Sequence, residues 1–173
     1  MRRRTLWAAG VAALAGSAGL AGHWWRSRSD AVGSTPDIWA LRFDTPQGGD
    51  ELALAPLRGH PLLLNFWATW CPPCVTELPL IDRFHREQRD RGWRVVGLAI
   101  DNRDPVRDFL ARHPVGFPIG LAGAAGVELA RGLGNVGGAL PFTVVFDRQG
   151  KPLVRKLGII RPEDLEAWSR QVG

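Results

Sequence analysis

The feature that most restricts the fold is a pair of cysteines between two different kinds of sequence. Cys71 and Cys74 are the only cysteines in the chain. Residues 61–68 before them form a continuous apolar run, typical of a strand buried on both faces. Residues 75–91 after them have apolar side chains at helical spacing and stop at Gly92. The pattern predicts a strand, a Cys-Pro-Pro-Cys turn and a helix.

Strand and helix patterns alternate along the rest of the chain. Residues 38–43 and 51–57 are short extended runs separated by Pro and Gly, which predicts an N-terminal β-hairpin. The other expected elements, in chain order, are a strand over 93–100, a helix capped by Asp104 and begun by Pro105, a strand over 117–121, a helix over 124–131, a hairpin over 141–147 and 152–158, and a helix over 162–172. This alternation predicts an α/β fold whose sheet contains parallel strands and is covered by helices.

The net charge of +5 is concentrated at the N-terminus. Residues 1–30 hold five arginines and one aspartate, which gives +4 and leaves +1 for all later residues. The body of the chain is therefore close to neutral, and the chain contains no tyrosine. Without a basic stripe, the pattern argues against nucleic acid as a partner.

Three arginines precede an uncharged run over residues 6–25, an order typical of a segment that directs export. The positive flank is expected to stay in the cytoplasm while the rest crosses the membrane. Two outcomes stay open. Gly19 and Ala21 offer small residues to a signal peptidase, whereas Trp24 and Trp25 are typical of the interfacial belt of an anchor.

The residues after this segment are small, polar and without pattern, which indicates a linker. We therefore expect residues 1–30 to be a signal peptide or an N-terminal membrane anchor, residues 31–36 to be a linker, and residues 37–173 to form the folded domain. The domain is expected outside the cytoplasm, where thiols meet an oxidising environment.

The predicted position of Cys71, at the N-terminus of a helix, favours its thiolate form. Pro72 suits the first helical position, and Pro73 also lacks an N–H group. Cys71 then depends mainly on the Cys74 amide and the helix dipole, so its thiolate is only moderately stabilised. Such a dithiol is a comparatively strong reductant. Cys74, inside the first turn, is expected to be the more buried, resolving thiol.

Other uses of the cysteine pair are less consistent with the sequence. A structural disulfide over so short a loop would stabilise little. A zinc site needs about four ligands, and a copper site further soft ligands, but the four histidines are scattered and the one methionine is at position 1. A peroxidase would need a different environment around Thr69. C-x-x-C between a strand and a helix favours redox exchange; a copper metallochaperone and a disulfide-introducing oxidant stay open as alternatives.

Three parts of the chain together resemble the thioredoxin-like TlpA/ResA group of membrane-anchored or periplasmic thiol-disulfide oxidoreductases. They are N-F-W-A-T-W-C-P-P-C at 65–74, L-P-F-T-V-V-F-D-R-Q-G-K-P-L at 140–153, and the export segment. The resemblance covers about residues 37–173. It implies a thioredoxin fold with an N-terminal β-hairpin and a central αβ insertion over 104–132, no cofactor or metal beyond a redox-active Cys71–Cys74 disulfide, and a place in the bacterial periplasm, soluble or tethered to the inner membrane by residues 6–25.

The resemblance also implies roles for individual residues. Cys71 would be the nucleophile and Cys74 the resolving cysteine. Pro141 falls where the family has a cis-proline beside the dithiol, and Leu140 where the backbone pairs with a bound substrate segment. An ordinary strand-initiating proline is the alternative at position 141.

The residues beside the dithiol complete the candidate site. Trp70 is expected to form an apolar lip against which a partner protein docks, next to Pro72 and Pro73. Asn65 stands where thioredoxins often have a buried aspartate that moves protons. Glu77 matches a glutamate of the ResA-like branch and is a candidate acceptor for the Cys74 proton, the alternative being a solvated helix charge.

The resulting prediction is an exported protein that reduces disulfides in partner proteins. Cys71 attacks the partner disulfide, a mixed disulfide forms, and Cys74 releases the reduced partner. The resemblance implies a membrane thiol transporter as electron donor. The clients stay open among apocytochrome c, copper-site cysteines of an oxidase and general targets. Leu140-Pro141-Phe142-Thr143 departs from the Ala-Pro-Glu-Thr of the cytochrome-maturation branch and favours the broader TlpA-like group.

Overall fold

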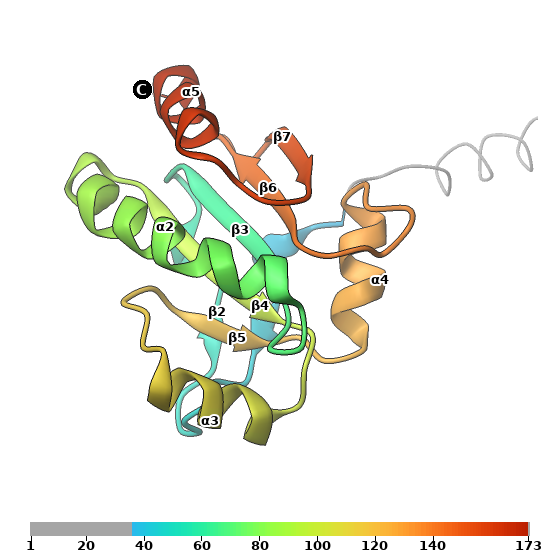
Figure 1. Cartoon of the computed structure of the whole chain (residues 1–173). Helices are drawn as coiled ribbons and strands as arrows, with labels where there is room; N and C mark the ends of the chain where they lie inside the picture. Colours follow the sequence, from blue (N-terminus) through green and yellow to red (C-terminus); the bar gives the residue numbers. More distant parts are fainter. Residues whose placement is uncertain (1–35, 173) are drawn as a thin grey trace, which may run out of the picture. The chain divides into compact units, whose positions relative to one another are not determined.

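The computed structural model of the chain describes residues 36–172 (Figure 1). The predicted signal peptide or anchor over 1–30 lies outside the described residues, as does nearly all of the predicted linker over 31–36. Among the helices of the described part, none combines the length and the apolar character needed to cross a bilayer.

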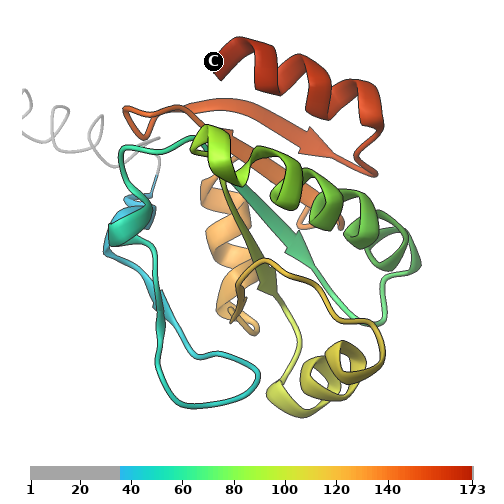
Figure 2. The same cartoon turned by 90° about the vertical axis from the view of Figure 1, so that its left-hand side faces the viewer.

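A five-stranded sheet with the order β5-β4-β3-β6-β7 lies at the centre of the fold (Figures 1 and 2). The strands are β3 (Leu62–Trp67), β4 (Arg94–Ala99), β5 (Ile119–Leu121), β6 (Phe142–Phe146) and β7 (Pro152–Leu157). β3, β4 and β5 are parallel, β6 is antiparallel to β3, and β7 is antiparallel to β6. β3 is thus the central strand, and burial of all its residues explains its continuous apolar sequence.

Successive side chains of β3 enter two different hydrophobic clusters, because a strand alternates between the faces of its sheet. Leu63 and Trp67 pack with the helices α2 (Pro72–Gln88), α3 (Arg103–Arg112) and α5 (Pro162–Val172). Leu64 and Phe66 pack with α4 (Ala125–Gly132) and the N-terminal segment. Figures 1 and 2 show α2, α3 and α5 on one face of the sheet and α4 on the other.

The N-terminal hairpin is present but shorter than expected. β1 (Arg42–Phe43) and β2 (Leu52–Ala53) pair in antiparallel fashion over two residues each. The predicted extended runs over 38–43 and 51–57 are otherwise wrong, because 3-10 turns η1 (Ile38–Ala40) and η2 (Ala55–Leu57) replace strand. In η1 the Asp37 carboxylate accepts a hydrogen bond from the Trp39 amide and so begins a turn.

Helix boundaries agree with the sequence to within one residue except at two ends. α5 spans the predicted residues, and α2 begins at Pro72 but ends at Gln88, after which η3 (Arg89–Arg91) leads to Gly92 in the left-handed conformation. The predicted cap at Asp104 is wrong, because Asn102 is the N-cap of α3. Pro105 is then the third helical residue, where its missing N–H has no intrahelical partner to lose.

Candidate active site at the start of α2

Cys71 and Cys74 form a disulfide at the N-terminus of α2. Cys71 is the N-cap residue, and its Sγ accepts a hydrogen bond of 3.3 Å from the Cys74 amide. Pro72 and Pro73 fill the first two helical positions without N–H groups. The Cys74 amide is therefore the first backbone donor that the helix offers to the Cys71 sulfur, as the sequence predicted.

The two cysteines differ in burial in the predicted sense. Cys71 is 5% exposed and Cys74 is 0% exposed. Pro72 and Pro73 are exposed next to them, so solvent approaches the dithiol from the helix start. This difference suits Cys71 to the first attack and Cys74 to the internal, resolving step.

Pro141 is placed at the same end of the sheet as the dithiol. The Phe66–Phe142 pairing of β3 with β6 puts Pro141 level with Trp67, after which the chain continues to Cys71. The Leu140–Pro141 peptide bond is cis, which agrees with the family's cis-proline and not with the alternative of an ordinary strand-initiating proline. Leu140 packs against both hydrophobic clusters.

Glu77 is buried beneath the helix start, at 2% exposure. One carboxylate oxygen, Oε1, accepts a hydrogen bond of 2.8 Å from Asn65 Nδ2, and Oε2 accepts one of 2.7 Å from the Ile160 amide. The alternative of a solvated helix charge is therefore wrong. Asn65 Nδ2 also donates to Thr143 Oγ1 at 3.0 Å, and Thr143 is a partner that the sequence analysis missed.

Burial raises the pKa of Glu77 above its usual value of 4.5. Three weaker influences act in the opposite direction, because they favour the ionised carboxylate: the Ile160 amide, the Asn65 amide and the charge of Lys156. A carboxyl group whose pKa is raised takes up a proton more readily than an ordinary glutamate, a property suited to general acid–base chemistry.

The two tryptophans near the dithiol, Trp67 and Trp70, differ in environment. Trp67 is fully buried and packs against Phe109 with ring centroids 5.5 Å apart. Trp70 is 67% exposed next to Cys71. Leu157 and Ile159 are also exposed, and Gly158 between them donates a backbone hydrogen bond to Pro141. Apolar side chains are thus accessible beside both the dithiol and the cis-proline.

Asp101 fixes the turn that leads to the dithiol, a role that was not predicted from the sequence. Its carboxylate, at 8% exposure, accepts a hydrogen bond of 2.5 Å from the Thr69 amide. The Cys71 amide closes the same turn by donating to the carbonyl of Ala68. The signal in the sequence was an aspartate directly after a buried strand, which pattern alone does not distinguish from a loop residue.

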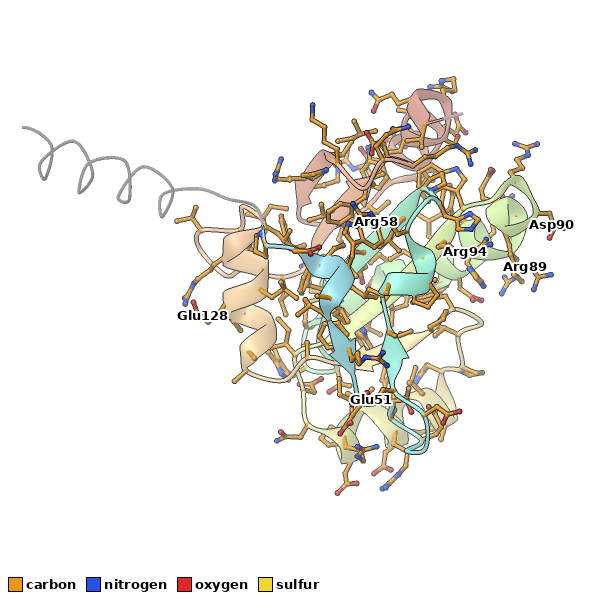
Figure 3. All side chains as sticks on the ribbon, turned by 180° about the vertical axis from the view of Figure 1, so that it is seen from behind. Glu51, Arg58, Arg89, Asp90, Arg94 and Glu128 are labelled. Carbon is orange, nitrogen blue, oxygen red and sulfur yellow. A yellow bond between two sulfur atoms is a disulfide. The ribbon has the colours of Figure 1, made fainter. Side chains whose placement is uncertain are left out.

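Replacing Asp101 by Ala is expected to destabilise the domain by about 2 kcal/mol, because the part-buried Thr69 amide loses a charged acceptor. Asp101→Asn keeps an acceptor oxygen and should lose less. Urea unfolding measures both, with Asp90→Ala as the control, since Asp90 projects into solvent from η3 (Figure 3). Equal stability of the Ala variant and the wild type would contradict the assignment.

The described part of the chain offers no cluster of side chains suited to bind a metal ion. Among residues 36–172, no group of three or more His, Cys, Asp or Glu side chains is arranged to hold a metal ion.

Sequence comparison places residues 31–166 within the family model described as Redoxin. The thiol-disulfide oxidoreductase ResA of Geobacillus kaustophilus is 32% identical over 139 residues, which cover 79% of this chain and 75% of that protein. ResA of Bacillus anthracis is 28% identical over 126 residues, covering 72% of this chain and 70% of that protein.

Solved structures agree with the fold. StoA from Bacillus subtilis superposes with a TM-score of 0.62 at 27% identity, covering 78% of this chain and 99% of that chain. A thioredoxin-family thiol:disulfide interchange protein from Chlorobium tepidum superposes with a TM-score of 0.68 at 24% identity, covering 76% and 92% of the two chains. The predicted thioredoxin fold, with its N-terminal hairpin and the insertion formed by α3, β5 and α4, is confirmed.

Proposed function

Since this chain belongs to the Redoxin family, and within it to the ResA-like thiol-disulfide oxidoreductases, we propose that it reduces disulfides in partner proteins outside the cytoplasm. Membership makes it a protein-disulfide oxidoreductase. The direction of electron flow, the clients and the cellular location are the proposal.

The environment of the Cys71 sulfur is the observation that supports the proposed direction of electron flow, from this protein to its client. It accepts one backbone hydrogen bond, from the Cys74 amide, and the two intervening residues are prolines without N–H groups. A dithiol is an oxidant when its reduced form is strongly stabilised. With a single backbone donor and the helix dipole, the Cys71 thiolate is stabilised only moderately, which favours a reductant.

The reaction proceeds in two exchanges. The Cys71 thiolate attacks one sulfur of the client disulfide, and the other client sulfur leaves as a thiolate. The Cys74 thiol then gives its proton to the Glu77 carboxylate and attacks the Cys71 sulfur. This step breaks the mixed disulfide, releases the second client thiolate and forms the Cys71–Cys74 disulfide. Two electrons pass to the client, and no bound cofactor or metal takes part.

The client docks on the surface around the helix start. Trp70 offers an exposed apolar face next to Cys71 in the chain, and the exposed Pro72 and Pro73 follow the cysteine at the helix start. Leu140, before the cis peptide bond, supplies backbone groups to an extended client segment. Aromatic side chains of this kind contribute large apolar contact areas at interfaces.

Each cycle leaves the dithiol oxidised, so two electrons and two protons must be resupplied. We assign this step to a membrane thiol donor, with the domain exported by the N-terminal segment and released or kept at the membrane. The proposed clients are apocytochrome c thiols, copper-site cysteines of an oxidase or general extracytoplasmic targets, and the departure of Leu140-Pro141-Phe142-Thr143 from the cytochrome-maturation pattern favours the broader range.

The equilibrium reduction potential of the Cys71–Cys74 pair tests the direction. In residues 31–173, equilibrated with defined dithiol buffers, we expect a value near or below about −250 mV, on the side of thioredoxin. A value near about −120 mV would make the protein an oxidant that introduces disulfides. Stoichiometric copper retained by the reduced protein against a chelator would instead support a metallochaperone.

A further inference from the structure

On the face of the sheet that is covered by α2 and α5, one row of cross-strand neighbours, here called the polar rung, consists of polar side chains. Asn65, Thr143 and Lys156 are direct cross-strand neighbours on β3, β6 and β7. Residues directly opposite one another in a sheet share a face, so the three side chains lie on the side covered by α2 and α5. The next rung on this face is apolar: Leu63, Val145 and Val154.

A buried acid lies at the inner end of the polar rung, and a cation lies at its outer end, near the surface. At the inner end Asn65 donates to the Glu77 carboxylate, which is 2% exposed. At the outer end the Lys156 side chain is 26% exposed, and its ammonium forms an ion pair of 2.7 Å with Asp164 of α5.

Asp164 is itself fixed by the start of α5. Its Oδ2 accepts a hydrogen bond of 2.8 Å from the Arg161 amide, and the same oxygen pairs with the Lys156 ammonium. A carboxylate bound to the free amides of a helix start is held in one orientation. The ammonium is therefore held against the sheet and α5, where its field is screened less than in open solvent.

We propose that Lys156 is a positioning residue for thiol–disulfide exchange: its ammonium charge favours the ionised carboxylate of Glu77 and so keeps Glu77 ready to accept the Cys74 proton. This inference rests on the proposed role of Glu77 as proton acceptor. The charge of Lys156 lowers the pKa of Glu77, as this role requires. Burial has the larger effect and raises that pKa.

Among the groups that the structure places next to Glu77 within residues 36–172, Lys156 is the one whose positive charge acts on the carboxylate. The Glu77 carboxylate accepts hydrogen bonds from Asn65 of β3 and from the Ile160 amide, Asn65 in turn contacts the neutral Thr143 of β6, and the Asp164 carboxylate of α5 pairs with Lys156. Without the ammonium, the carboxylate would keep only hydrogen-bond donors against the cost of burial.

Lys156→Met in the full chain tests the proposal, with Lys151→Met as the matched control. Lys151 is the chain's only other lysine, and it is exposed in the β6–β7 turn. Loss of the ammonium raises the Glu77 pKa, so fewer molecules hold an ionised Glu77 at a given pH. We expect the acid limb of the pH profile for mixed-disulfide resolution to move up by about one pH unit. At a given pH on that acid limb, the variant should resolve the mixed disulfide up to about tenfold more slowly than the wild type.

Two measurements separate this proposal from the role of Glu77 itself. A carboxyl-carbon NMR titration of Glu77, assigned by its loss in Glu77→Gln, should move to higher pH in Lys156→Met and return in Lys156→Arg. An unchanged Glu77 titration in Lys156→Met would overturn the proposal for Lys156, whatever the kinetics. If the titration moves but Glu77→Gln retains the acid limb, Lys156 acts on Glu77 as inferred and the proton-acceptor role fails.

Discussion

Replacing Cys71 by Ser is expected to lower disulfide reduction by at least about a thousandfold, because the first attack loses its nucleophile. Serine is a favoured N-cap residue, so its hydroxyl can still accept the Cys74 amide and α2 should remain capped. Replacing Cys74 by Ser should leave the first attack intact and stop the reaction at the mixed disulfide. Reduction of a disulfide-containing client peptide, followed by mass spectrometry of the products, measures both effects.

The two variants distinguish the roles of the cysteines. Cys74→Ser should accumulate a covalent adduct through Cys71, and Cys71→Ser should accumulate none. An adduct on Cys74 in the Cys71→Ser protein would reverse the assigned roles. It would also conflict with the burial of the two side chains, since Cys74 has no exposed surface.

Replacing Glu77 by Gln is expected to slow release of the mixed disulfide by about a hundredfold at neutral pH, within the range of general acid–base catalysis. The amide is nearly isosteric and can still accept one hydrogen bond, but it cannot take the Cys74 proton. Because the Glu77 pKa is raised by burial, the wild-type rate should increase with pH through that pKa, and the variant should lack this rise. Stopped-flow single turnovers with a reduced enzyme and a client disulfide give the two profiles.

Glu87→Gln is the matched control for this experiment. Glu87 lies on the same helix but is exposed and paired with Arg83. It should leave the exchange kinetics unchanged. Identical profiles for wild type and Glu77→Gln across neutral pH would exclude Glu77 as the proton acceptor, and the Cys74 proton would then leave directly to solvent.

The elements that local pattern determines were predicted well. The apolar run before Cys71 is β3, and the helical spacing after it is α2. The bounds of α5 agree because Pro162 and the following acids favour a helix start. The hairpin strands were too long because Asp37 begins a 3-10 turn through one side-chain hydrogen bond, which apolar content does not reveal.

The surroundings of the site were predicted only in part, because they are made by residues far apart in sequence. Glu77 lies three residues after Cys74, and this spacing predicts where it lies on the helix. The spacing does not predict that its side chain is buried. That burial depends on the Ile160 amide, 83 residues later, and on Asn65. Thr143 and Lys156 join the same group only through strand register. No local periodicity encodes which residue of β6 stands opposite Asn65, or which residue of β7 stands opposite Thr143.

The exposed apolar residues near the dithiol and the cis-proline, Trp70, Leu157 and Ile159, belong to neither hydrophobic cluster of the domain. The dithiol, Glu77 and its hydrogen-bond partners are held instead by α2, the sheet and the start of α5. Surface positions of this kind usually tolerate substitution with little change in stability. On the proposed docking surface, Trp70, Leu157 and Ile159 can thus be varied without changing the groups that surround the sulfurs, so a combinatorial library at these three positions can seek new clients while the environment of the Cys71–Cys74 pair stays constant.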